Sequence, residues 1–177
     1  HQNGTPMTDS KFDHDSPLSL THWPSVKKPM AGQAMTAIWE EILSTFSAPN
    51  PLPQGGKAEL PVWNAGTFNE GYRKEDHHLN SSGLLIDYDS AWSAGGGALG
   101  NPDLSSDDLR SCWGAFRFVA HTTPSHRQGQ ARWRVFLPFT RSVSACEYRD
   151  MARWATQWGE SRGAPGLSHD TSWHSPV

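Results

Sequence analysis

The chain has 177 residues, of which 36% are hydrophobic, and its net charge at pH 7 is −3. This length allows one domain with a buried core, and the nearly balanced charge argues against a generic binder of polyanions. No apolar run approaches the roughly 18 residues of a membrane-spanning helix, so we expect no membrane partner. The two cysteines, Cys112 and Cys146, support neither a disulfide framework nor a cysteine-based zinc site. We therefore expect a reducing, cytoplasmic setting and no bound zinc.

Charge is distributed unevenly along the chain. Residues 1–109 carry 6 basic and 14 acidic side chains, a net charge of −8. Residues 110–177 carry 9 arginines, no lysine and 4 acidic side chains, a net charge of +5. Arginine presents a planar fork of donors that suits phosphate groups. The pattern fits phosphate binding by the second half, and it equally fits a solvated surface of mixed charge.

The first part of the chain predicts an irregular segment followed by a helix. Residues 1–33 are rich in proline, serine, aspartate and histidine and show little periodicity. Within this segment, we expect residues 1–6 to precede a natural start at Met7. Apolar side chains recur at helical spacing over 34–46, which predicts a helix with one apolar face. We place the start of the main domain, 34–177, at this helix.

The remainder of the chain predicts alternating strands and helices. The apolar run from Leu84 to Ile86 predicts a strand at 82–89 that is covered on both faces. Four further elements follow: a short helix at 104–112, strands at 115–122 and 132–139 that form a hairpin, and a helix at 144–158.

Both of these helices begin with a capping box. The pairs are Ser105 with Asp108 and Ser144 with Glu147. The element order predicts an α+β fold with a largely antiparallel sheet and helices on one face. The chain reaches Val177 without a terminating element, so we expect it to be a fragment of a longer protein.

Asp87 and Asp89 end the predicted strand at 82–89. Side chains alternate across a strand, so the two aspartates share one face and Tyr88 points to the other. Two adjacent carboxylates repel each other unless a cation neutralises them, and hard oxygen ligands favour Mg²⁺ or Mn²⁺. The Asp-x-Asp spacing also occurs in glycosyltransferases and in solvated turns, so by itself it leaves these alternatives open.

A histidine and two arginines follow on the predicted hairpin. His126 ends the segment HTTPSH (121–126), and the hydroxyls of that segment are further donors for a phosphate. A single histidine after a strand is otherwise a surface residue. Arg132 and Arg134 alternate on the next strand, so both project to one face beside the turn that carries His126. Carboxylates, a histidine and an arginine pair together suit a nucleotide whose phosphates are bridged by metal ions.

Three segments in this order resemble the motifs of a known family. LLIDYD (84–89), HTTPSH (121–126) and RWRVFLP (132–138) resemble the archaeo-eukaryotic primase superfamily, in particular the primase-polymerase domains of plasmid, phage and mobile-element replication proteins. PVWNAGTFNEGYR (61–73) and RSVSACEY (141–148) are similar to flanking segments of that group. The resemblance covers about residues 35–158. It implies an RRM-like palm with an antiparallel-rich sheet and flanking helices, plus an N-terminal α/β extension.

The resemblance also implies an activity for residues 34–177. It is template-directed nucleotidyl transfer, which synthesises and extends RNA or DNA primers on single-stranded DNA from NTPs or dNTPs, with two Mg²⁺ or Mn²⁺ ions. The metal ligands and catalytic residues would be Asp87, Asp89 and Asp170. The nucleotide-binding residues would be His126, Ser125, Thr123, Arg134 and Arg132, and weaker candidates for DNA contact are Arg73 and Arg127. The chain has no Walker A motif, so a helicase domain or protein is expected in the full-length context.

The third metal ligand lies where the chain departs from the family pattern. Asp170 follows His169 instead of an aliphatic residue, and Trp173 follows Ser172 where the family often has arginine. This departure motivates an alternative function, a catalytically weak or inactive DNA-binding module of a replication initiator.

Two enzymatic alternatives have less support. A nickase of the His-hydrophobic-His type needs two histidines separated by one residue, and none of the nine histidines has that spacing. A glycosyltransferase needs a sugar-nucleotide domain before the Asp-x-Asp segment, and the preceding chain is too short for one.

Overall fold

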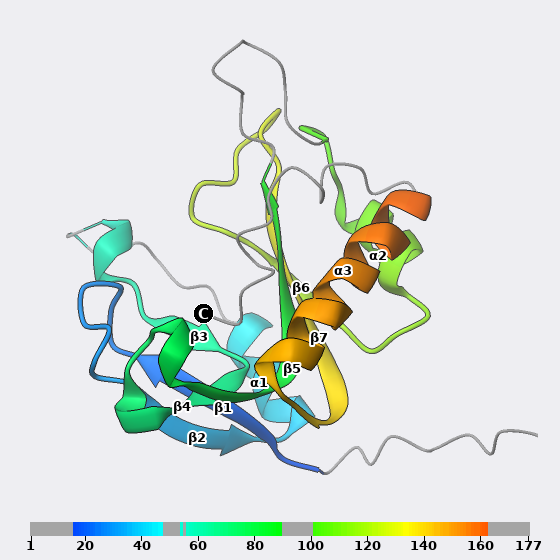
Figure 1. Cartoon of the computed structure of the whole chain (residues 1–177). Coiled ribbons are helices and arrows are strands. Elements are labelled where there is room, and N and C mark those ends of the chain that lie inside the picture. The colour runs from blue at the N-terminus through cyan, green and yellow to red at the C-terminus, as the bar shows by residue number, and fades with distance from the viewer. Residues whose placement is uncertain (1–15, 48–53, 55, 90–100, 163–177) are drawn as a thin grey trace, which may run out of the picture.

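Two antiparallel sheets and three α-helices make up the fold (Figure 1). The computed structural model describes residues 16–47, 54, 56–89 and 101–162. The strands are β1 (Leu18–Trp23), β2 (Gln33–Ala37), β3 (Val62–Asn64), β4 (Gly66–Phe68), β5 (His78–Asp89), β6 (Val119–Thr122) and β7 (Arg132–Val143). The helices are α1 (Trp39–Ser47), α2 (Ser106–Trp113) and α3 (Ala145–Ser161), with short 3₁₀ turns η1 (Lys57–Glu59), η2 (Asn69–Gly71) and η3 (Glu75–His77). The predicted α+β class with antiparallel sheets is confirmed.

The smaller sheet has the order β2-β1-β3 and corrects two predictions. The segment 1–33 is not irregular throughout, because 18–23 forms the central strand of this sheet, with Leu18 and Leu20 buried. The helix predicted at 34–46 is wrong in its first part, because 33–37 pairs with β1 and the helix begins only at Trp39. Apolar side chains at positions 35, 37 and 39 fit the period of a strand as well as part of a helical pattern.

The larger sheet has the order β4-β5-β7-β6 and is built on two strands of 12 residues each. β5 and β7 pair from Leu84↔Leu137 to Asp89↔Arg132. The strands predicted at 82–89 and 132–139 are therefore confirmed, and both are longer than predicted. The strand predicted at 115–122 is confirmed only over 119–122, where it pairs with β7 as the first strand of the expected hairpin.

Helices α2 and α3 cover one face of the larger sheet, which we call the helix face. Both predicted capping boxes are present at their N-termini. Leu84, Ile86 and Val135 point into this layer and are almost fully buried. The indole Nε1 of Trp113 in α2 donates a hydrogen bond to the hydroxyl of Tyr88 at 2.8 Å. Alternate residues of the paired parts of β5 and β7 thus belong to this core.

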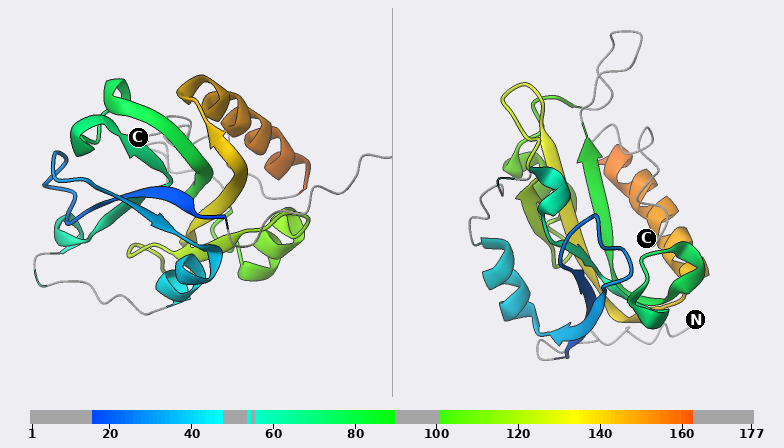
Figure 2. Two further views of the ribbon diagram at one scale, coloured as in Figure 1. Left: turned by 90° about the horizontal axis from the view of Figure 1, so that it is seen from below. Right: turned by 90° about the vertical axis from the view of Figure 1, so that its left-hand side faces the viewer.

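The smaller sheet and α1 lie against the opposite face, which we call the groove face. The prediction of helices on one face only is therefore wrong, because α1 packs on the other face from α2 and α3. Figure 2 shows α1 and the N-terminal strands on one side of the larger sheet and α3 on the other. Leu85 and Phe136 belong to the apolar cluster on this side, together with Leu20 and Ile42. A buried hydrogen bond ties the two sheets together, in which Thr21 Oγ1 donates to the carbonyl oxygen of Gly66 at 2.6 Å. Within the described ranges, no helix has the length and apolarity needed to cross a membrane.

Candidate functional site

The two aspartates lie on the groove face. Each belongs to a row of in-register residues that runs across the strands of the larger sheet. Asp87 is paired in register with Arg134, and Asp89 with Arg132. His121 on β6 is in register with Arg134, so it extends the first of these rows. Next to the two polar rows lies an apolar row formed by Leu85, Phe136 and Val119. The predicted shared face of Asp87 and Asp89 is confirmed, and Tyr88 points to the helix face.

Each aspartate forms an ion pair with the arginine opposite it. Arg134 binds Asp87 through both carboxylate oxygens, with Nε–Oδ1 at 2.6 Å and Nη2–Oδ2 at 2.7 Å. Arg132 Nη1 lies 3.0 Å from Asp89 Oδ2. The hydrogen bonds to Asp87 raise the pKa of Arg134. Two guanidinium groups therefore neutralise the carboxylates, the role that the sequence alone assigned to a metal ion.

The Arg132–Asp89 pair is less complete than the Arg134–Asp87 pair. Asp89 Oδ1 and Arg132 Nε are both buried and have no hydrogen-bond partner among the described residues. A buried carboxylate oxygen without a partner is costly, and it is open to a further donor or a cation.

The donor set fits a hard divalent cation. Mg²⁺ is commonly held by one or two carboxylates together with substrate phosphates and water. Asp87 and Asp89 supply two carboxylates on one face, and one buried oxygen of Asp89 has no hydrogen-bond partner among the described residues. Among the described residues, no group of three or more His, Cys, Asp or Glu side chains could hold a metal ion. Asp170, the predicted third ligand, lies outside the described residues.

His121 is a candidate site residue that the sequence-based prediction did not include. Its ring stacks on Phe46 of α1, with centroids 4.9 Å apart and planes 17° from parallel, and its Nδ1 lies 3.0 Å from the carbonyl oxygen of Thr122. Burial, helped by the charge of Arg134, lowers the pKa of His121. The sequence carried only part of the signal, because alternation along a strand gives His121 a face but not the register with β7 that places it beside Arg134.

His126 lies in the hairpin turn, outside the set of residues that line the groove. Its Nδ1 accepts a hydrogen bond from the backbone N–H of Arg132 at 3.1 Å, and its ring meets Trp133 edge-on at 5.5 Å. These contacts orient the turn that precedes Arg132. Of its neighbours, Thr123 lines the groove and Ser125 does not.

Neither candidate for DNA contact lines the groove. Arg73 Nη2 donates to the carbonyl oxygen of Val26 at 3.3 Å, and the guanidinium lies 5.8 Å from the ring centroid of Trp23. Arg127 forms an isolated bridge with Gln130 in the hairpin turn. The turn itself uses Gly129 at a φ of 71°, a conformation that favours glycine.

A groove of about 960 Å³ runs over these rows. Its floor is the groove face of β5, β6 and β7, and its walls come from the end of α1 and from the segment of η1 and β3. Its charged lining residues are Asp87, Asp89, Arg132, Arg134 and Lys57. The site thus combines two carboxylates and three cations in one open cavity, a set that can bind both metal ions and phosphate groups.

Comparisons with known proteins found no relative for this chain. No protein-family model, no curated protein and no solved structure matches it. The function is therefore inferred from the site.

Proposed function

We propose that the protein is a template-directed nucleotidyltransferase that makes and extends primers on single-stranded DNA. The observation that carries this proposal is the pair of rows Asp87–Arg134 and Asp89–Arg132 on the floor of an open groove. Ligand pockets typically measure about 300–1,000 Å³, so the groove is large enough for a nucleotide. The order of the three motifs that resemble primase-polymerases supports the same activity.

The arginines would change partners when a nucleotide binds. A triphosphate offers Arg132 and Arg134 several oxygens in place of one carboxylate, and arginine binds phosphate through two parallel hydrogen bonds. Both pairs are about one-third exposed, so a ligand in the groove reaches them without unfolding the sheet. The carboxylates of Asp87 and Asp89, once released, are free to hold a divalent cation beside the phosphates.

Each group then has a defined task. Divalent ions held by Asp87 and Asp89 would lower the pKa of the attacking hydroxyl and neutralise the leaving pyrophosphate. Arg132 and Arg134 would hold and neutralise the triphosphate, and Thr123 offers a further hydroxyl at the edge of the groove. Asp170 stays our proposed third ligand.

A primer-synthesis assay tests the proposal. Wild-type protein is incubated with single-stranded DNA, labelled NTPs or dNTPs, and Mn²⁺ or Mg²⁺. We expect short products that disappear in Asp87→Asn and Asp89→Asn and that fall strongly in Asp170→Asn. The matched control is Asp103→Asn, an exposed aspartate outside the groove, which should retain full activity. The catalytic proposal fails if wild type makes no product, or if the products persist in Asp87→Asn.

A second candidate function is a nucleic-acid-binding module without catalysis. The observation that favours it is that Arg134 and Arg132 each pair with one of the two carboxylates and neutralise it. This candidate predicts that DNA binding is independent of Mn²⁺ and unchanged in Asp89→Asn. Calorimetric titration with Mn²⁺ separates the two, because only the enzyme should show a metal site that depends on Asp87 and Asp89.

A further inference from the structure

The outer edge of the smaller sheet is formed by β2, which is paired on one side only. β2 pairs with β1 through five in-register residue pairs, from Leu18↔Ala37 to His22↔Gln33, with no register shift. On its other side, no backbone group of β2 forms a hydrogen bond with the part of the chain that the structure describes. Figure 1 shows β2 along the lower rim of the molecule. An exposed row of backbone donors and acceptors is a template for a further strand.

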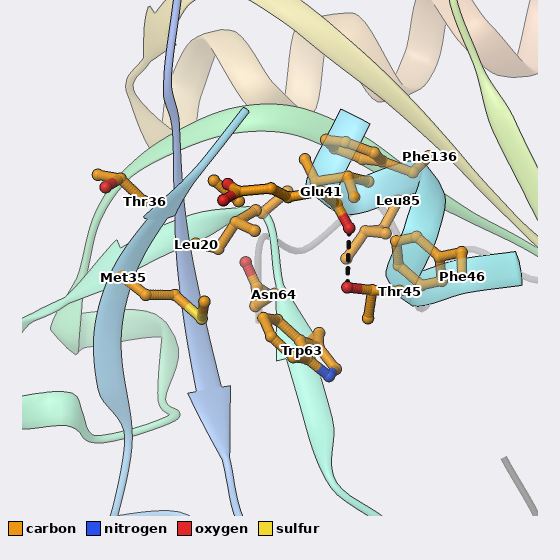
Figure 3. Close-up of a pocket in the computed structure, with 13 residues that line it drawn as sticks. Leu20, Met35, Thr36, Glu41, Thr45, Phe46, Trp63, Asn64, Leu85 and Phe136 are labelled. Carbon is orange, nitrogen blue, oxygen red and sulfur yellow. Dashed lines mark hydrogen bonds between the residues drawn. The ribbon is translucent and has the colours of Figure 1, made fainter. Parts of the chain in front are cut away.

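The side chains of β2 point to the two faces of the sheet and leave this edge open. Met35 points toward Trp63 and lines a cavity of about 280 Å³ between the two sheets, while Thr36 projects to the other side of the strand (Figure 3). The backbone immediately before β2 is already engaged, because the N–H of Gly32 donates to the carbonyl oxygen of Gly71 at 3.0 Å. The open edge therefore coincides with β2 itself.

β2 lacks the features with which proteins protect an edge strand. Such strands are usually short, bulged, or marked by lysine or proline. The other edge strands of the described structure fit this rule, because β3 and β4 have three residues each, β6 has four, and the pairing of β4 with β5 shifts register. β2 has five residues in regular pairing, and its sequence QAMTA contains neither a charge nor a proline. Of these edges, β2 is therefore the one best suited to pair with another strand.

The residues around β2 make it complementary to a second copy of itself. In antiparallel self-pairing centred on Met35, the start of β2 in one copy lies beside the end of β2 in the other. Lys28 precedes the strand and Glu40 follows it in the first turn of α1, and both are exposed. The pairing therefore brings a lysine toward a glutamate at each end, and no like charges meet within β2. The two Met35 side chains, each 38% exposed in the single chain, come to lie opposite each other on one face.

We infer that the protein forms a symmetric dimer in which β2 of one copy pairs antiparallel with β2 of a second copy. The two smaller sheets then join into one sheet with the order β3-β1-β2-β2-β1-β3, and the two-fold axis passes between the two Met35 residues. Such an interface is isologous, so the same edge serves both copies. Interfaces below about 1,200 Å² are typically weak, and an edge-to-edge contact is small, so the dimer should dissociate on dilution. The inference does not depend on the proposed function.

Sedimentation velocity over a wide range of protein concentrations tests the inference. The sedimentation coefficient of wild type should rise with concentration from that of a monomer to that of a dimer. Met35→Lys should stay monomeric, because the two lysines would face each other across the axis, and like charges directly opposite are destabilising. The matched control is Leu79→Lys, which changes an exposed apolar residue of β5 and should dimerise like wild type. Wild type that stays monomeric up to millimolar concentration overturns the inference.

Disulfide cross-linking gives a second readout, which does not depend on the folding of Met35→Lys. In a background of Cys146→Ser, which removes the exposed cysteine, Met35→Cys and Gln33→Cys each place one thiol on β2. Opposite residues of an antiparallel pair have Cα atoms about 4.5–5.5 Å apart, within the range that a disulfide spans. In the proposed register, position 33 of one copy lies about 14 Å from position 33 of the other, which is too far for a disulfide.

The two cysteine variants therefore test the register as well as the contact. With oxidised glutathione as the oxidant, Met35→Cys should give a covalent dimer on a non-reducing gel, and Gln33→Cys should remain a monomer. Equal cross-linking of both variants indicates random collisions and overturns the inference, and so does cross-linking of neither. These readouts are independent of activity, so a monomeric protein that makes primers would overturn the dimer and leave the proposed function standing.

Discussion

At the scale of single residues, the bidentate pair between Arg134 and Asp87 dominates the site. Both groups were candidates from the sequence, but as separate ligands for phosphate and metal. The structure shows them bound to each other, with two hydrogen bonds shorter than 2.8 Å. A phosphate and a metal ion must therefore each compete with an internal partner. This coupling implies that nucleotide and metal assist one another in binding.

Arg134→Gln tests this coupling. Without nucleotide, the variant should bind Mn²⁺ more tightly than wild type does, because Mn²⁺ no longer has to displace a guanidinium from Asp87. Affinity for tripolyphosphate should fall about 10- to 100-fold, since a hydrogen bond to a charged group contributes about 1.5–3 kcal/mol. Both changes are measured by calorimetry. Arg149→Gln, which loses only an exposed pair with Glu75, is the control and should match wild type. Unchanged or weaker Mn²⁺ binding by Arg134→Gln contradicts the coupling.

The sequence predicted which side chains of the site share a face better than it predicted their contacts. Alternation along a strand is a local property, so the shared face of Asp87 and Asp89 and that of Arg132 and Arg134 could be predicted. The pairing of Asp87 with Arg134 depends on the register between β5 and β7, which are far apart in the chain. His121 was missed for the same reason, because only the register of β6 on β7 places it beside Arg134.

At the scale of elements, sequence signals contained within a few residues predicted the structure correctly. Apolar periodicity that fits both a strand and a helix did not. Both capping boxes were predicted correctly, because each is complete within four residues. β2 was mistaken for the start of a helix, because its conformation depends on pairing with β1. Its side chains are mostly exposed, so its apolar pattern carried little information.

The cap of α3 gives a pH-dependent prediction. Arg141 and then the backbone and hydroxyl of Ser144 lower the pKa of Glu147 from 4.5 to about 2. A carboxyl with a lowered folded-state pKa stabilises the fold above its unfolded pKa and loses that contribution as pH falls through the folded one. Glu147→Gln should therefore lower the melting temperature at pH 7, and its deficit relative to wild type should shrink between about pH 4.5 and pH 2.

Thermal unfolding monitored by circular dichroism at several pH values checks this prediction. Glu160→Gln, near the other end of α3, is the matched control and should show no such pH-dependent difference. A deficit of Glu147→Gln that stays constant down to pH 2 would rule out ionisation as its origin.

Gly83 gives a second prediction for an element, the central strand β5. A Cβ atom at this position would lie 2.2 Å from Cε2 of Phe136 and 2.7 Å from the carbonyl oxygen of Leu137. Gly83→Ala should lower the free energy of unfolding by about 1–3 kcal/mol, because the neighbouring strand must shift. Denaturant titration measures the effect. Leu79→Ala, at an exposed position of the same strand, should cost much less. Equal stability of Gly83→Ala and wild type would mean that Phe136 moves aside freely.

At the scale of the whole molecule, the acidic and basic halves of the sequence do not form separate faces. The ion pairs Asp87–Arg134, Asp89–Arg132 and Glu75–Arg149 each join an acid from the first half to an arginine from the second. The antiparallel pairing of β5 with β7 interleaves the two halves in the larger sheet. Part of the charge asymmetry along the chain is therefore neutralised where the two halves meet.

The same pairing predicts that the molecule unfolds as one unit. β5 and β7 give alternate residues to two cores, Leu84 and Ile86 to the helix face and Leu85 and Phe136 to the groove face. If either core is lost, one face of β5 and β7 becomes exposed to solvent. The other core depends on the same two strands. In native-state hydrogen exchange, the most protected amides of β1 and of α3 should therefore report the same free energy of opening.

Thr21→Val makes this prediction sharper. It removes the buried hydrogen bond from Thr21 to Gly66 that links the sheets, at a cost of about 1–2 kcal/mol, while keeping the shape of the side chain. Opening free energies in β1 and α3 should fall by the same amount, since the variant weakens a shared structure. Thr140→Val, at an exposed position of β7, should change neither. If β1 loses protection while α3 keeps it, the smaller sheet opens independently of the larger sheet, and the prediction of a single unfolding unit is wrong.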